Sequence, residues 1–113
     1  MILGTARLTL SLPGNRSLKG KRKVVRRIVD RVRHRYNASI AEVDDMDVHQ
    51  RVVLGLAVVS NDASHAQAMV DTLVSFVATA ADAVLVDRKS ELVHLGDGEH
   101  MAAWDEWDDD EPT

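Results

Sequence analysis

The sequence predicts a single α+β domain in which an antiparallel sheet carries two helices on one face. Its 113 residues are enough for one hydrophobic core and too few for two. With 45% hydrophobic and 28% charged residues, the chain can form a packed interior. Segments that alternate apolar and polar residues, typical of strands, surround two segments with helical spacing of apolar residues. A disordered chain is therefore excluded by composition and pattern.

The chain begins with a predicted strand and a predicted helix. Residues 2–12 alternate with period two, which indicates a strand. Turn residues 13–15 follow, and Ser17 is suited to cap a helix over residues 18–36. The apolar stripe of this helix repeats at helical spacing and predicts the face that packs on the core: Val25, Ile28, Val29, Val32 and Tyr36.

A hairpin is predicted in the middle of the chain. Asn37 favours a left-handed exit from the first helix, because asparagine tolerates positive φ. Residues 38–43 are predicted to form a strand, residues 44–47 a turn, and residues 51–60 a second strand. The second strand is apolar on both faces at residues 52–59, which indicates a central position in the sheet.

A second helix and a last strand complete the domain. Residues 60–62 offer three N-cap side chains, and apolar residues repeat at helical spacing over residues 63–80. The last strand is predicted over residues 84–95, with a polar interruption at residues 87–90. The resulting order, βαββαβ, predicts a ferredoxin-like sandwich of a four-stranded antiparallel sheet with both helices on one face.

This architecture leaves one sheet face without helices. The alternation of the strands places several small and apolar residues there, and we expect a second copy of the chain to cover them. The residues of this predicted dimer interface are Leu3, Thr5, Val53, Gly55, Ala57 and Val59, with Arg7 beside them.

Charge is distributed unevenly along the chain. The net charge is −4, yet residues 1–41 hold eleven basic residues and one acid, whereas the remainder holds three basic and seventeen acidic residues. Eight of the acids lie after Gly96, so residues 1–96 carry a net positive charge. A basic body indicates an anionic partner.

Four ordered motifs resemble those of a bacterial protein family. They lie at residues 16–25, 37–43, 49–51 and 55–62. Over residues 1–95 the chain resembles the YlxP-like family, a domain of unknown function. The resemblance implies a ferredoxin-like fold. Since genes of this family often lie beside those for translation initiation and ribosome maturation factors, it also implies a role at the ribosome or on its RNA. One departure is Gly20, where relatives usually carry an acid that would form a capping box with Ser17.

The first helix and the loop before it supply the candidate RNA-binding residues. A solvated helix face usually mixes charges of both signs, whereas Asp30 is the one acid of this helix. We therefore favour a polyanion-binding surface, with contacts to phosphates, since few aromatic residues are available to stack on bases. Its residues are Arg16, Lys19, Lys21, Arg22, Lys23, Arg26, Arg27 and Arg33.

Other site chemistries are less well supported. The absence of cysteine excludes a disulfide and a thiolate metal site and favours a reducing cytoplasm. The Asp44, Asp45, Asp47 and His49 cluster fits a turn better than a metal site, and Asp62 with His65 fits a helix start better than an acid–base pair. No catalytic or phosphate-binding motif is present. We expect no enzyme activity, cofactor, metal or membrane partner.

The acidic segment after Gly96 is predicted to be a disordered tail, because its composition cannot form a core. A solvating extension is the favoured interpretation, and a weak internal competitor lying over the basic helix is the alternative. For the whole chain we expect a non-enzymatic RNA-binding or ribosome-associated cytoplasmic factor in ribosome maturation or translation. The alternative is a homodimeric protein-interaction module that binds a translation or assembly factor through the open sheet face.

Overall fold

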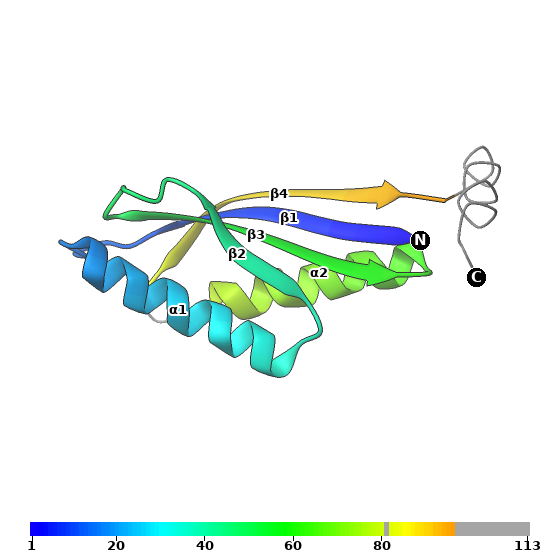
Figure 1. The fold of residues 1–113 in the computed structure, drawn as a ribbon, viewed down its shortest axis with the longest axis horizontal. Coiled ribbons are helices and arrows are strands. Elements are labelled where there is room, and N and C mark those ends of the chain that lie inside the picture. Colours follow the sequence, from blue (N-terminus) through cyan, green and yellow to red (C-terminus); the bar gives the residue numbers. More distant parts are fainter. Residues whose placement is uncertain (81, 97–113) are drawn as a thin grey trace, which may run out of the picture.

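A computed structural model describes residues 1–80 and 82–96 and has the predicted α+β architecture (Figure 1). Four strands form one antiparallel sheet in the order β2-β3-β1-β4, and both helices lie on one face of it. The elements are β1 (Ile2–Ser11), α1 (Leu18–Arg35), β2 (Ser39–Asp44), β3 (Arg51–Ser60), α2 (Ala63–Ala78) and β4 (Val84–His94). The predicted element order is confirmed. The predicted tail, residues 97–113, lies outside the described residues.

The core lies between the sheet and the two helices. In β1 and β3 every even-numbered residue is buried, from Ile2 to Leu10 and from Val52 to Val58. These rows pack with the buried faces of α1 and α2, including Val32. A shift by one residue would expose the whole apolar row, so burial fixes which face each strand presents. The odd-numbered residues of β1 and β3 are thereby placed on the open face.

The exit from α1 differs from the prediction. Asn37 does not adopt a left-handed conformation, since Asp45, with φ 52°, is the one non-glycine residue with positive φ in residues 1–80 and 82–96. The helix instead ends at Tyr36 in extended backbone, and the Tyr36 ring meets Phe76 of α2 edge to face at 5.2 Å. This aromatic contact holds the chain as it turns into β2. Within the described ranges, no helix is long and apolar enough to span a membrane.

The predicted interruption of the last strand is wrong. β4 is continuous from Val84 to His94 and pairs with β1 along its length, with a register shift that leaves Val86 as an extra residue. Such a bulge bends a strand without ending it. The polar residues are tolerated because β4 is an edge strand whose side chains are mostly exposed, and Arg88 pairs with Asp71 of α2.

The Arg88–Asp71 pair predicts a measurable pH effect. Hydrogen bonds from Arg88 and then from Gln67 hold the pKa of the Asp71 carboxyl below its ordinary value. A lowered pKa in the folded state adds stability above the unfolded pKa, and this stability is lost as pH falls through the folded pKa. In an Arg88→Gln variant, NMR titration of the Asp71 carboxyl is expected to show a pKa closer to the ordinary value. An unchanged pKa would contradict the pairing.

Candidate nucleic-acid interface

Five basic side chains form an exposed surface on the first part of α1 and the loop before it. Four of them are spaced at i, i+3, i+4 and i+7, so they share one helix face. None of the five forms an ion pair or side-chain hydrogen bond with residues 1–80 or 82–96. We call them the basic surface: Arg16, Lys19, Arg22, Lys23 and Arg26.

The basic surface lies at the helix end where positive charge is least favourable for stability. The N-terminus of a helix carries a partial positive charge, and acids stabilise it there. The first turn of α1 contains no acid, and its cap is the neutral Ser17 hydroxyl, which accepts from the Gly20 N–H at 3.0 Å. The helix dipole and the cations therefore add to one positive potential that no described side chain neutralises.

Asn15 holds the loop that carries Arg16. Its Nδ2 donates to the Ser17 carbonyl at 2.9 Å and also to the His49 carbonyl in the β2–β3 connection. A Cβ atom at position 20 would lie 2.3 Å from Asn15 Oδ1. Glycine at this position therefore leaves the room that the Asn15 side chain occupies.

Lys21 is not part of an exposed interface, which corrects its assignment as an RNA-binding residue. Its side chain is 2% exposed, and its Nζ lies 2.9 Å from Glu42 Oε2 of β2 and donates to the Asp45 carbonyl. Oε2 is buried and accepts no aligned hydrogen bond from the described residues, so the contact is an ion pair. Lys21 thus links α1 to the sheet.

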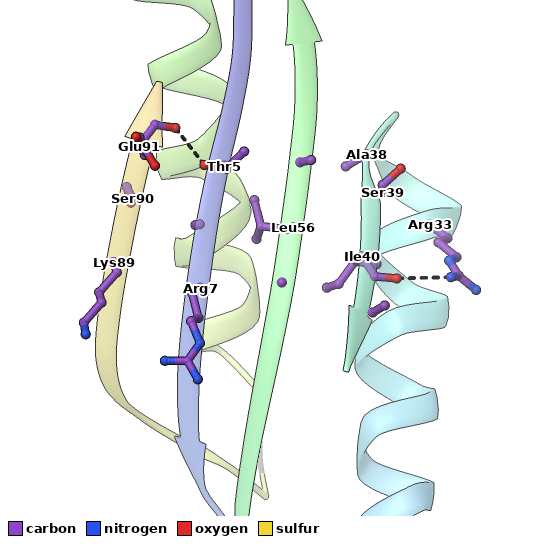
Figure 2. Close-up of a pocket in the computed structure, with 14 residues that line it drawn as sticks. Thr5, Arg7, Arg33, Ala38, Ser39, Ile40, Leu56, Lys89, Ser90 and Glu91 are labelled. Atoms are coloured by element: carbon purple, nitrogen blue, oxygen red, sulfur yellow. Dashed lines mark hydrogen bonds between the residues drawn. The ribbon is translucent and has the colours of Figure 1, made fainter. Parts of the chain in front are cut away.

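Two other predicted RNA-binding residues are exposed but already have partners. Arg27 forms an ion pair with Asp82, and the Arg33 Nη2 donates to the Ile40 carbonyl at 3.1 Å (Figure 2). Farther along α1, Arg31 and Arg35 lie over the Phe76 ring, at 5.9 and 5.3 Å from its centroid. Within the described ranges, the cations of α1 that have no side-chain contact are therefore those at the beginning of the helix.

The open sheet face contains a groove of about 910 Å³ with a floor of small residues. Its lining follows two rows of cross-strand partners, Ser39–Ala57–Thr5–Glu91 and Ala41–Gly55–Arg7–Lys89. Figure 2 shows Arg7 and Lys89 on neighbouring strands and Arg33 at the β2 side. Sequence inspection could not find the β4 members, because only the register of β1 with β4 brings them to the groove.

Val53, predicted to be in an exposed dimer interface, is buried with 2% exposure. It does lie on the open side of β3, opposite Thr9 and Asp44. Arg7 belongs to β1 and Asp44 to β2, the two neighbours of β3. Their ion pair, at 2.8 Å, therefore spans β3 on the open face, next to Val53. Leu3, Thr5, Gly55 and Ala57 are partly exposed and Val59 is 61% exposed, so Val59, at the other end of the face, is the most exposed apolar residue of the predicted interface.

This difference predicts opposite outcomes for two aspartate variants of β3. Val53→Asp buries an unpaired charge and should lower the free energy of unfolding by about 3–5 kcal/mol. Val59→Asp, on the same face but exposed, should change it by less than about 0.5 kcal/mol. Urea unfolding of both variants measures this, and equal destabilisation would contradict the burial difference. Sedimentation of Val59→Asp beside the unmodified chain then reports any dimer formed through this face.

Two members of the acidic cluster at residues 44–49 form ion pairs. Asp44 and Asp45 pair with Arg7 and Arg51, respectively. No group of three or more His, Asp or Glu suited to a metal occurs in the described ranges. Asp62 occupies the N-cap position of α2 without a side-chain cap bond, and His65 is exposed.

Two solved structures resemble this fold at 16% sequence identity. One is a de novo designed protein with a ferredoxin fold, with a TM-score of 0.52 over 87% of this chain and 91% of the design. The other, a dimeric ferredoxin-like protein from an uncultured marine organism, has a TM-score of 0.44 over 85% and 99% of the two chains. The first likeness supports the fold alone.

Sequence comparisons give the family. The uncharacterized protein YlxP of Bacillus subtilis is 36% identical over 61 residues, which are 54% of this chain and 66%, just under two thirds, of that relative. The family described as "Protein of unknown function (DUF503)" matches residues 3–90, well over half of the chain. This protein therefore belongs to the DUF503 family, in agreement with the YlxP-like motifs of its sequence.

Proposed function

We propose that this protein is a non-enzymatic RNA-binding factor that acts at the ribosome in the cytoplasm, in its maturation or in translation. The observation that carries the proposal is the basic surface, whose five cations are exposed and have no partners in the described ranges. Such a surface repels itself and opposes the helix dipole, so stability does not explain it. Binding to a polyanion does, because phosphates supply the missing negative charge.

The chemistry of the surface favours contacts with the nucleic-acid backbone. The described aromatic rings, Tyr36 and Phe76, pack on each other and are only partly exposed, so they offer no stacking platform for bases. Lysine and arginine on one helix face, together with the loop that Asn15 holds, would contact phosphates and recognise the shape of a helical RNA. The choice of RNA over DNA rests on the ribosomal gene context that the YlxP-like motifs imply.

The decisive experiment measures RNA binding by the full chain over a series of salt concentrations. If all five cations contact phosphates of a duplex, the slope of log K against log salt is expected to be about −4.5, at about 0.9 per contact. In parallel, the tagged chain should travel with a ribosomal subunit from cell extract at low salt and dissociate at high salt. A slope near zero, with no ribosomal association, would contradict the proposal.

A further inference from the structure

The groove on the open sheet face leads toward the point where the described chain ends. β4 runs along β1 to His94, and Leu95 then exchanges backbone hydrogen bonds with Met1, each at 2.9 Å. Beside this point, the cross-strand row of Val59, Leu3 and Val93 continues the groove with apolar side chains. Val59 is 61% exposed and Val93 37% exposed, so this end of the face lacks a cover among the described residues.

The chain that follows has the composition to provide such a cover. Residues 97–113 contain both tryptophans of the protein, Trp104 and Trp107, together with eight acids and no basic residue. The groove presents the complementary chemistry. Its floor is built from small residues, its rim carries Arg7, Arg33 and Lys89, and Glu91 is the one acid in its lining.

We propose that the C-terminal segment of this chain, residues 97–113, docks in the groove, with Trp104 on the small-residue floor and the acids beside it near Arg7 and Lys89. This interaction is separate from RNA binding by the basic surface. Composition alone favours a solvating extension. We favour docking instead, because the structure has a groove that composition does not reveal.

The length of the segment fits this placement. Trp104 is the eighth residue after Gly96, and an extended chain of eight residues reaches about 26–29 Å. To reach the row that contains Ala57 and Thr5, the segment must run back along the sheet from Leu95 to the level of Glu91. This distance is four strand residues, about 14 Å. The next row, with Arg7 and Lys89, lies two residues farther along the strands, and Glu106 likewise lies two residues after Trp104, with Asp105 between them.

Charge alone would also attract the acids to the basic surface on α1, but tryptophan distinguishes the two locations. The basic surface consists of long charged side chains and offers no apolar floor. In the groove, the indole covers Ala57 and its small neighbours while the carboxylates reach the cations at the rim. Lys89 has no ion-pair partner in the described ranges, and Arg7 is shared with Asp44. The docking is therefore both apolar and electrostatic.

Tryptophan fluorescence tests the proposal directly, since all tryptophan signal comes from the segment in question. In the full chain, quenching by acrylamide is expected to be several-fold weaker than in the unfolded chain. Lys89→Glu and Ala57→Glu, both in the groove, should raise the quenching toward the unfolded value. The matched controls Lys19→Glu, on the basic surface, and Ala78→Glu, on the exposed side of α2, should leave it unchanged. Circular dichroism verifies that each variant is folded.

Three results would overturn the proposal. Tryptophans as accessible in the folded chain as in the unfolded chain would mean that the segment does not dock. Loss of protection in Lys19→Glu but not in Lys89→Glu would place the segment on the basic surface. Protection that disappears on dilution would assign the groove to contacts between copies. RNA affinity is not used in this experiment, so its outcome is independent of the proposed function.

Discussion

A Lys21→Met variant is expected to lose about 3 kcal/mol of unfolding free energy. Removing one member of a buried ion pair leaves the other charge without compensation, a change that typically costs about 3–5 kcal/mol. Here the remaining charge is Glu42, whose side chain is 19% exposed, and the Asp45 carbonyl also loses its donor. Because Glu42 is partly accessible to water, we expect a loss of unfolding free energy at the lower end of this range. For a domain of this size, the melting temperature should fall by roughly 12–24 °C.

The control for this prediction lies two residues away. Lys23→Met removes the same charge from an exposed position of the same helix and should change the unfolding free energy by less than about 0.5 kcal/mol. The double variant Lys21→Met with Glu42→Met should recover stability, since an apolar pair of similar volume replaces a buried ion pair at little cost. Equal melting temperatures for Lys21→Met and Lys23→Met would show that the ion pair does not stabilise the fold.

Reversing the charges of Arg22 and Arg26 together is expected to weaken RNA binding by roughly 60-fold near 0.1 M salt. Each phosphate contact contributes about 0.9 to the slope of log K against log salt, so two contacts contribute about 1.8 to log K at 0.1 M salt relative to 1 M salt. The slope itself should become less steep by about 1.8. Both side chains are exposed and without described partners, so the melting temperature should remain nearly unchanged.

A second pair on the same helix provides the matched control. Arg31→Glu with Arg35→Glu has the same four-residue spacing and the same change in net charge, but these arginines lie over Phe76 and outside the basic surface. RNA affinity should fall far less than in the first pair, while stability falls modestly as the cation–π contacts are lost. Equal loss of affinity in both pairs would mean that net charge, and not the basic surface, governs binding.

The fold could be predicted from the sequence because its strongest signals are local. The alternation in β1 and β3 and the helical spacing in α1 and α2 each fix a buried face without knowledge of the rest of the chain. β4 was harder to predict, because its polar residues 87–90 gain their backbone partners from β1, far away in sequence. The prediction for Asn37 followed the usual preference of asparagine for positive φ and was wrong, since the helix exits through extended backbone at Tyr36, whose ring contacts Phe76 of α2.

The candidate site could be predicted only in part, for the same reason. A helical wheel identifies the positions that share a face, but it could not reveal that Glu42 lies beneath Lys21. The burial of Val53 likewise could not be predicted from β3 alone, because its cross-strand neighbours Thr9 and Asp44 belong to two other strands. Acids and strands that are distant in sequence pair with these residues or bury them, and the local sequence does not show such contacts. Five of the eight proposed RNA-binding residues have no such partner in residues 1–80 and 82–96, and these five make up the basic surface.

The central position of β1 has a consequence for the order of folding. Among the four described strands β1 comes first in the chain, whereas one of its neighbours, β4, comes after the other three, so Ile2 can pair with His94 only once those elements have been synthesised. Closing such a long loop is slow, because its entropy is lost before the pairing compensates for it. Until β4 emerges, one edge of β1 is unpaired, and an intermediate with β1 next to β3 would have the open hydrogen-bonding edge that promotes aggregation. The nascent chain is therefore most vulnerable to aggregation immediately before β4 is complete.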